Sequence, residues 1–188
     1  MFLSFEDRCS DSPFVERIWR CRSSRAGLFS SVAANHWEIV VTRLDGEATL
    51  TIRGPETRAT RARAPGDGEW LGIEVFIGRL LRAGRIGREP VVDNVVQGHR
   101  LALSTRTAQS RFVRATGLTY GAFRQTERAR HATELLRSGV PIADVVHDAG
   151  YFDQAHLTRS LKRLIGLTPG QIVRGEQQLS FLYKTTPA

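Results

Sequence analysis

The chain has few cysteines and no long apolar run, and each shortage excludes a class of protein. Cys9 and Cys21 form no CxxC pair and have no histidine cluster beside them, so the sequence offers no zinc site and favours two free thiols in a reducing compartment. No stretch approaches the ~18 apolar residues that a membrane-spanning helix needs. Glu6 and Asp7 interrupt the first residues, which lack the apolar core of a signal peptide. We therefore expect a cytoplasmic protein without membrane contacts.

Motifs of the common enzyme classes are also absent. The sequence has no GxSxG, no P-loop, no GxGxxG and no HExxH. Asp144, His147 and Asp148 lie near one another, but neither a nucleophile nor a full set of metal ligands accompanies them. We expect no enzymatic activity, no cofactor and no metal.

Positive charge is plentiful and unevenly distributed. The net charge is +8 and the pI is about 10.6. Residues 1–100 carry 15 basic and 13 acidic side chains, whereas residues 101–188 carry 12 basic and 6 acidic ones. The surplus in the second part favours an anionic partner such as a nucleic acid.

The first part of the chain has the alternation and turn signals of a β-sheet. Asp45-Gly46 is a two-residue hairpin signal, and residues 65–68, PGDG, form a turn cluster. The one helix expected here spans residues 13–20. The predicted strands are 36–44, 47–54, 57–64 as an exposed edge, and 70–77. We predict a small antiparallel β domain at residues 1–78.

From residue 79 the apolar period changes to that of helices. RLLRAG (79–84) and EPVVDNVVQG (89–98) read as short helices, with Pro90 in a first turn. The domains predicted after the sheet are a linker at 79–89, an all-helical DNA-binding domain at 90–175 and a tail at 176–188. The expected fold class is α+β, with two helix-turn-helix units in the helical domain.

A helix with a DNA-reading composition is predicted at about 104–115. Ser104 suits its N-cap and Gly117 its C-terminal stop. Ala108, Phe112 and Ala115 recur at i, i+4 and i+7 and give a buried stripe. The outward residues include arginine, which can bond guanine, and glutamine, which can bond adenine. An ordinary amphipathic surface helix would show the same stripe, so that alternative stays open.

The next helix, predicted at 120–137, would span ~27 Å. That length would set two reading helices about one turn of DNA apart, ~34 Å. A plain core helix explains its apolar pattern equally well.

A second unit is predicted in GVPIADVVHDAGYFDQAHLTRSLKRLIGLTP, residues 139–169. Gly150 permits the positive φ of a tight turn, and Asp153 caps a recognition helix at about 153–165. His156 in isolation would more often be a surface histidine, but its place at the start of this helix favours a contact with DNA. The residues expected to build the two units are Ser104, Phe112, Gly117, Ile142, Val145, Gly150, Tyr151, Asp153, Leu157, Leu161 and Pro169.

These residues resemble the AraC/XylS family of bacterial transcription regulators. The family pattern of a small residue, a Gly-aromatic turn, a recognition helix and G-x-[ST]-P is matched by AGYFDQAHLTRSLKRLIGLTP. The upstream pattern is matched by Ser104, Arg106, Phe112 and Gly117. The resemblance covers residues 90 to about 174, and it implies two recognition helices that enter successive major-groove segments on one face of the DNA.

The resemblance also implies roles for individual residues. Base-reading positions fall on Arg106, Gln109, Ser110, Gln154, Ala155, His156 and Arg159. Phosphate contacts are expected from Thr105, Arg111, Arg114, Lys162 and Arg163. SPFVERIW, HWEIVVT and RGPET resemble a family subgroup in which the first domain senses an effector or dimerises. Relatives usually have a longer domain and linker there, which implies a shortened first domain in this chain.

We therefore expect a sequence-specific regulator that binds double-stranded promoter DNA. RNA polymerase and a small-molecule effector are left open as further partners, and the oligomeric state is left open between monomer and homodimer. Two alternatives remain at this point. The chain is then either a basic module that binds nucleic acid with little sequence preference, or a degraded regulator without an effector response.

Overall fold

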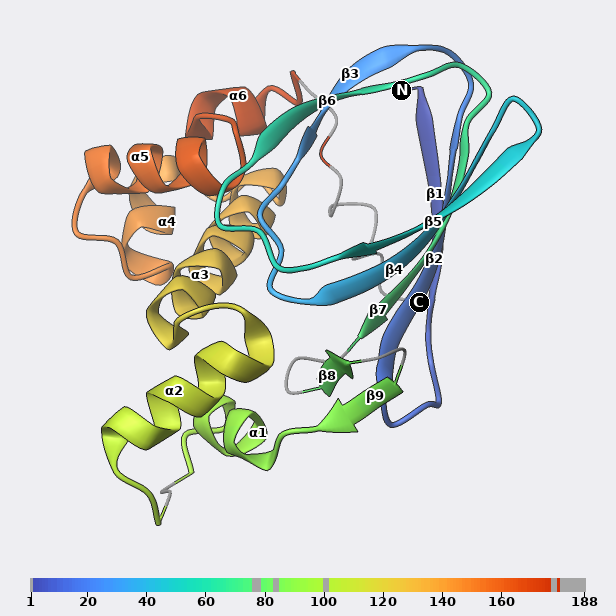
Figure 1. Ribbon diagram of the computed structural model, residues 1–188. Helices are drawn as coiled ribbons and strands as arrows, with labels where there is room; N and C mark the ends of the chain where they lie inside the picture. Colours follow the sequence, from blue (N-terminus) through green and yellow to red (C-terminus); the bar gives the residue numbers. More distant parts are fainter. Residues whose placement is uncertain (1, 76–78, 83–84, 100–101, 177–178, 180–188) are drawn as a thin grey trace.

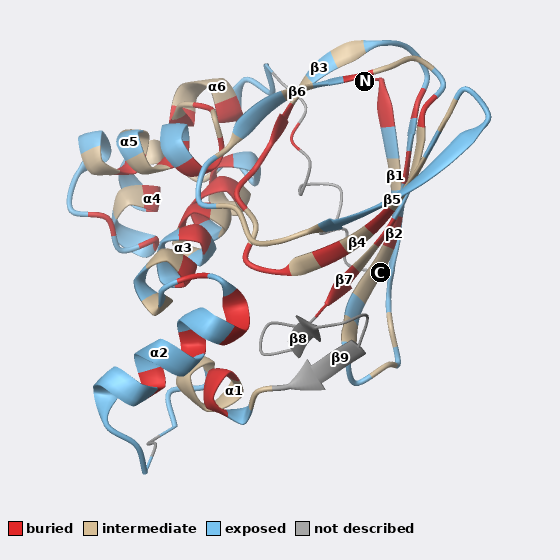
Figure 2. Cartoon of the chain, in the orientation of Figure 1, coloured by how far each residue is buried: buried red, intermediate tan, exposed pale blue. Residues whose placement is uncertain are grey.

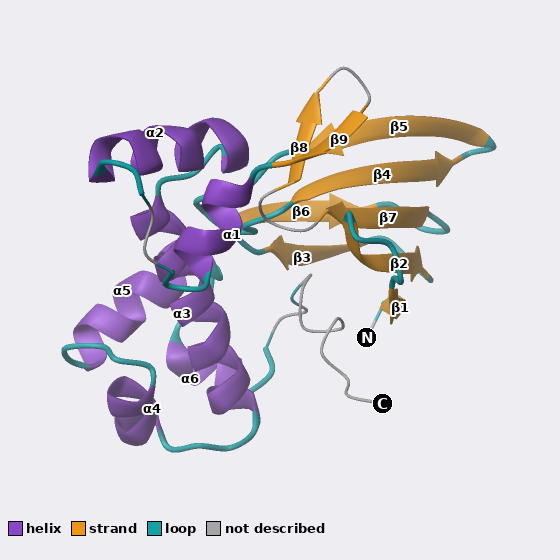
Figure 3. Cartoon of the chain, turned by 90° about the horizontal axis from the view of Figure 1, so that it is seen from below, coloured by secondary structure: helices purple, strands orange, loops and turns teal. Residues whose placement is uncertain are grey.

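The computed structural model describes residues 2–75, 79–82, 85–99, 102–176 and 179. An antiparallel β half is followed by a helical half, so the α+β fold predicted from the sequence is confirmed. In Figures 1 and 3 the helices of the second half lie together on one side of the strands. Among the described residues, no helix is both long and apolar enough to cross a membrane.

The β half is built from three antiparallel groups of strands. The largest has five strands in the order β1-β2-β7-β4-β5, while β3 pairs with β6 and β8 with β9. The bounds are β1 Leu3–Cys9, β2 Val15–Ser23, β3 Gly27–Ser31, β4 Trp37–Leu44, β5 Glu47–Arg53, β6 Thr60–Ala64, β7 Glu69–Val75, β8 Arg79–Arg82 and β9 Arg85–Arg88.

The predicted hairpin joins β4 to β5. Asp45 and Gly46 have φ values of 50° and 81°, and positive φ at both central residues is what a two-residue hairpin of this kind requires. The predicted strands 36–44, 47–54 and 70–77 correspond to β4, β5 and β7, whereas the edge strand β6 is shorter than predicted.

The helix predicted at residues 13–20 is wrong, because this segment enters strand β2. Trp19, Cys21 and Ser23 are buried and alternate with exposed Arg20 and Arg22. That period of two is typical of a half-buried strand and not of a helix. The arginines on the outer face concealed the alternation.

The helix predicted at residues 79–84 is also wrong, because residues 79–82 form β8 and pair with β9. Arg82 lies opposite Arg85 in this antiparallel pair. A helix of about one turn would have been costly to nucleate. The segment predicted as a linker therefore contains a β-hairpin. Positions 83 and 84 lie outside the described residues.

Six helices lie among the described residues of the helical half, and the last of them, α6, is the one that was not predicted from the sequence. Their bounds are α1 Pro90–Val96, α2 Thr105–Thr116, α3 Tyr120–Arg137, α4 Ile142–Asp148, α5 Gln154–Leu164 and α6 Pro169–Val173. The sequence analysis ended the second unit at Pro169, but the chain continues into α6. Thr168 and Gln171 form a capping box there, with Pro169 at the first helical position.

The largest hydrophobic cluster joins the two halves. Val32 and Ala33, just after β3, pack with buried residues of α3 to α6. Figure 2 shows buried positions on α3 and along the chain between β3 and β4. Of the predicted tail at 176–188, residues 176 and 179 are described, and Leu179 is buried in this cluster beside Ser30. The rest of that tail lies outside the described residues.

Candidate nucleic-acid interface

Local contacts fix the position and rotation of α2. The Oγ of Ser104 accepts a hydrogen bond from the backbone N–H of Thr107 at 3.2 Å, and Gly117 ends the helix with φ 77°. Phe112 is buried and packs edge-to-face on Tyr120 and Phe123, with ring centroids 5.6 and 6.1 Å apart. This packing determines which side chains of α2 face outward.

Every residue of α2 that we expected to contact DNA lies on the surface. These residues are Arg106, Gln109 and Ser110 for bases and Thr105, Arg111 and Arg114 for phosphates. Within the described part of the chain, no side-chain hydrogen bond or ion pair holds any of them. Their polar groups are therefore accessible to a partner.

The turn of the second unit is held from two directions. Gly150 has φ 67°, and the following Tyr151 is buried with its hydroxyl 3.2 Å from the Oγ of Ser160 on α5. From α3, Nη1 of Arg128 donates to the carbonyl of Gly150 at 3.2 Å, and its guanidinium lies 5.6 Å from the Tyr151 ring centroid. Burial raises the pKa of Tyr151, while the hydrogen bond with Ser160 and the charge of Arg128 oppose this rise. The phenol is therefore neutral and keeps its hydrogen bond with Ser160.

Helix α5 begins at a tight cap and buries one face completely. Oδ1 of Asp153 accepts a hydrogen bond from the backbone N–H of His156 at 2.6 Å. Leu157, Leu161 and Leu164 are at most 1% exposed. The side chains exposed on the opposite face are Gln154, Ala155, Arg159, Lys162 and Arg163.

Two of the predicted contact residues in α5 also make contacts inside the domain. The half-buried His156 ring packs edge-to-face on Tyr151 at 5.2 Å, and its Nδ1 accepts from the N–H of Phe152 at 3.4 Å. Nη2 of Arg163 donates to Oε1 of Gln125 on α3. The sequence did not reveal the Arg163 bond, because it depends on how α3 crosses α5, whereas the His156 contacts depend on the shape of the turn before α5.

The β half caps the C-terminal end of α5. The backbone N–H of Ala33 donates to the carbonyl of Leu164 at 2.8 Å, and that of Ala59 donates to the carbonyl of Arg163 at 2.9 Å. The last carbonyls of a helix have no partner within the helix, so these bonds satisfy groups that would otherwise need water or another cap. Asn35 adds a bond from its Nδ2 to Oε1 of Glu127 on α3 at 2.8 Å.

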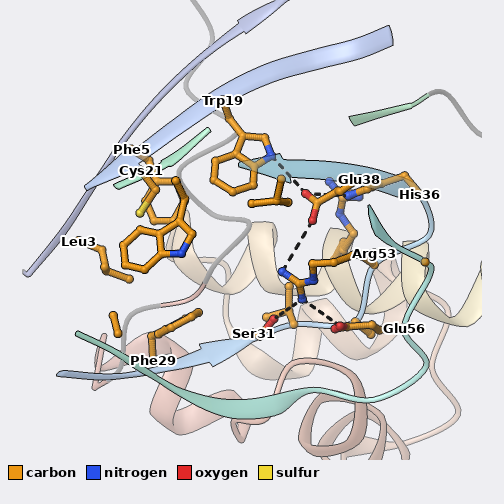
Figure 4. A pocket seen from close by; sticks show the side chains of 18 residues that line it. Leu3, Phe5, Trp19, Cys21, Phe29, Ser31, His36, Glu38, Arg53 and Glu56 are labelled. Carbon is orange, nitrogen blue, oxygen red and sulfur yellow. Dashed lines mark hydrogen bonds and ion pairs between the residues drawn. The ribbon is translucent and has the colours of Figure 1, made fainter. Parts of the chain in front are cut away.

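A cavity of about 130 Å³ lies beside this contact (Figure 4). One end is apolar, with aromatic side chains such as Phe5, Trp19 and Phe29. Cys21 also lines the cavity, and burial raises the pKa of its thiol to about 12, so it is protonated at neutral pH. The other end is polar and includes Arg130 of α3, so the cavity reaches from the β half to the helical half.

Charged side chains gather at the polar end of the cavity. Arg53 donates from Nη2 to Oε1 of Glu56 at 2.9 Å, and its Nη1 lies 3.8 Å from Oε2 of Glu38. Burial lowers the pKa of Arg53, but the hydrogen bond to Glu56 and the charges of Glu38 and Glu56 raise it above its ordinary value. Trp19 donates from Nε1 to Oε1 of Glu38 at 3.1 Å.

Comparison with known proteins matches the helical half. A family model described as a helix-turn-helix domain covers residues 98–175. The HTH-type transcriptional regulator RipA of Corynebacterium glutamicum is 31% identical over 74 residues, which are 39% of this chain and 22% of that protein. RipA of Corynebacterium diphtheriae is 37% identical over 67 residues, or 36% of this chain and 20% of that protein.

The regulatory protein ada of Salmonella typhimurium is 32% identical over 75 residues, which are 40% of this chain and 21% of that protein. The matched segment thus spans about a fifth of the length of each of these relatives. No solved structure matches the chain.

The helical half is therefore a DNA-binding domain of the kind found in transcription regulators. Residues 98–175 form an AraC-type helix-turn-helix domain, and the resemblance predicted from the sequence is confirmed for this domain.

Proposed function

We propose that the chain is a transcription regulator that reads a specific promoter sequence with α2 and α5. The observation that supports this most strongly is the fixed position of α5. Asp153 caps its first turn, the β half caps its last turn, and Gln154 and Arg159 stay exposed between them. Side chains discriminate between bases through bidentate hydrogen bonds, which require donors held in a constant position. Each good bidentate contact contributes ~1–3 kcal/mol of preference for the correct base.

The proposed contacts follow from exposure and chemistry. The residues assigned to bases are Arg106, Gln109 and Ser110 on α2 and Gln154, Ala155, His156 and Arg159 on α5. Those assigned to phosphates are Thr105, Arg111, Arg114, Lys162 and Arg163. Phe152 joins the base-contacting residues, because it is 91% exposed beside the start of α5 and apolar rings suit the thymine methyl group.

We assign separate roles to the two halves along the predicted boundaries. Residues 90–175 bind DNA, residues 1–78 sense or dimerise, and residues 79–89 connect them. A small-molecule effector in the cavity would contact the polypeptide between β3 and β4, which also holds Ala33 against the end of α5. The cavity, with its aromatic and charged ends, suits a compact amphipathic molecule.

The test is fluorescence anisotropy of the full chain on duplexes from the region upstream of its own gene, with scrambled duplexes of equal length. A sequence-specific regulator binds its site ~10³-fold or more tightly than the scrambled duplex. Both affinities fall with salt, because phosphate contacts release counterions. Equal affinity for all duplexes would support the alternative of a basic module without sequence preference.

Paired substitutions separate base reading from charge. Arg159→Ala is expected to cost ~1–3 kcal/mol at the preferred site and far less on scrambled DNA. Lys162→Ala is expected to weaken both duplexes alike and to reduce the salt slope by ~1. Arg61→Ala, an exposed arginine on β6, is the charge-matched control and should change neither. A uniform loss with Arg159→Ala would remove it from the base-reading set.

A further inference from the structure

Three potential metal ligands meet at the polar end of the cavity. Glu38 on β4 lies directly across the antiparallel pair from Glu74 on β7, and His36 precedes Glu38 by two residues. One ligand atom from each lies within 4.8 Å of the others. Nε2 of His36 is 3.4 Å from Oε1 of Glu38 and 3.9 Å from Oε1 of Glu74. Figure 4 shows His36 beside the Glu38 carboxylate.

A second observation concerns the imidazole of His36. The residue is 9% exposed, and its Nε2 is buried and forms no hydrogen bond with any described residue. A buried polar atom without a partner is costly, and buried carboxylates are usually paired or coordinate metals. Here the nitrogen faces two carboxylate oxygens that are close by but are not aligned as its hydrogen-bond acceptors.

The spacing of the three atoms suits a tetrahedral ion. Zinc binds histidine nitrogen and carboxylate oxygen at ~2.0–2.2 Å, so neighbouring ligand atoms in a tetrahedral site lie about 3.3 Å apart. The distances from Nε2 of His36 to the two carboxylates come close to this value and need only a small contraction. Because His36 and Glu38 line the cavity, a fourth position would open into it.

The surroundings orient the carboxylate of Glu38 in the way that outer-sphere groups orient metal ligands. Trp19 donates to Oε1, and the Arg53 guanidinium stands 3.8 Å from Oε2. Arg53 is itself held by Glu56 at 2.9 Å, so its charge is shared with a second carboxylate. Glu38 can therefore offer Oε1 to an ion while Oε2 faces Arg53.

We propose that His36, Glu38 and Glu74 bind one divalent transition-metal ion, with Zn²⁺ as the best fit. This metal site is additional to the proposed DNA binding, and its test does not depend on whether the chain binds DNA. It would tie β4 to β7 and hold the residues that lead from Ala33 to β4. No metal was expected from the cysteine and histidine spacing, because these three ligands come together only through the pairing of β4 with β7.

The test uses the full chain, untagged and treated with a chelator, titrated with ZnCl₂ by calorimetry. Metal content is then measured after gel filtration, and CoCl₂ gives an absorption spectrum that reports coordination geometry. We expect one Zn²⁺ per chain, a rise in melting temperature on adding zinc, and a tetrahedral cobalt spectrum. His36→Gln and Glu74→Gln should each weaken binding by more than about 10-fold.

Two variants serve as controls for the zinc titration. His147→Gln removes an exposed histidine that lies 3.2 Å from Asp148, and it should bind zinc as the wild type does. Glu74→Gln keeps the shape of the side chain, and circular dichroism checks that this variant is folded. It therefore still tests the site if His36→Gln does not fold. The proposal is overturned if the wild type takes up no zinc, or if uptake survives both His36→Gln and Glu74→Gln. Absence of zinc uptake would mean that His36 only lies beside the two carboxylates. Uptake that survives both substitutions would indicate adventitious zinc binding elsewhere.

Discussion

The two helix-turn-helix units are held in place by different parts of the molecule. In the first unit, α2 is fixed by a small aromatic cluster of its own, formed by Phe112, Phe123 and the valines of α1. In the second, α5 is fixed by a large cluster that includes Val32 and Ala33, and by two backbone hydrogen bonds from the β half. Between the described residues of α2 and the β half, no such backbone bond is found.

This difference indicates that the β half supports α2 and α5, the two helices proposed to read DNA, unequally. A change in the β half reaches α5 through backbone bonds to its last turn, whereas α2 packs on α1, β8 and α3 without such bonds. If an effector or a metal acts on DNA binding, the second unit is the one expected to respond. The variants that follow, in order of decreasing effect, test this asymmetry.

Removing a buried side chain from each core should have the largest effect. Leu161→Ala and Phe112→Ala each remove a side chain that is at most 1% exposed, at an expected cost of ~2–5 kcal/mol. Leu161→Ala should loosen α5 and also raise hydrogen exchange near Ala33. Phe112→Ala should instead loosen α1, α2 and the start of α3, where Tyr120 and Phe123 contact its ring. Chemical denaturation gives the cost, and exchange mass spectrometry gives the location. Equal loosening of both units by both variants would contradict the asymmetry.

A substitution in the turn of the second unit should come next. Gly150 has φ 67°, and a left-handed conformation costs ~1–2 kcal/mol for a residue with a Cβ, more for a β-branched one. Gly150→Val should therefore lower the melting temperature clearly. Gly121→Ala is the control, because Gly121 is helical and an added Cβ would make only an ordinary contact with Oγ1 of Thr119 at 3.9 Å, so alanine there should be neutral or stabilising. A wild-type melting curve for Gly150→Val would count against this turn geometry.

The two N-caps should have smaller effects, of unequal size. Ser104→Ala and Asp153→Ala each remove an acceptor for a backbone N–H, at a typical cost of ~0.5–2 kcal/mol. The Asp153 bond is shorter, at 2.6 Å against 3.2 Å, and its carboxylate also interacts favourably with the helix dipole. Asp153→Ala should thus cost more than Ser104→Ala in thermal unfolding. The reverse order would show that the second unit is fixed chiefly from its C-terminal end.

The smallest effect is expected from Arg128 on α3. Arg128→Ala removes the solvent-exposed hydrogen bond to Gly150 and the contact with the Tyr151 ring, at an expected cost of ~0.5–1 kcal/mol. Arg124→Ala is a suitable control, since Arg124 is exposed on the same helix. A stability indistinguishable from that of the control would mean that α5 alone holds the turn.

The elements with strong local signals could be predicted from the sequence. The Asp45-Gly46 turn, the cap at Ser104 and the turn at Gly150 each depend on a residue whose own chemistry defines the backbone. Strand β2 was missed because arginines fill its outer face, and α6 was missed although the capping box from Thr168 to Gln171 was readable.

Other features could not be predicted because they depend on tertiary pairing. The bond from Ala33 to Leu164 joins backbone atoms far apart in sequence and needs no particular side chain. The meeting of His36, Glu38 and Glu74 depends on the register of β4 on β7. The identities of the base-reading residues stay predictions, because exposure on α2 and α5 shows access and not contact.

Selection of duplexes from a randomised DNA library tests sequence reading by α2 and α5 most directly. The wild type should enrich two short sequence segments about one helical turn apart. A Gln154→Ala/Arg159→Ala variant should lose the preference at one segment, and an Arg106→Ala/Gln109→Ala variant should lose it at the other. No enriched sequence with the wild type, or the same weakened pattern with both variants, would contradict the reading of DNA by two separate helices.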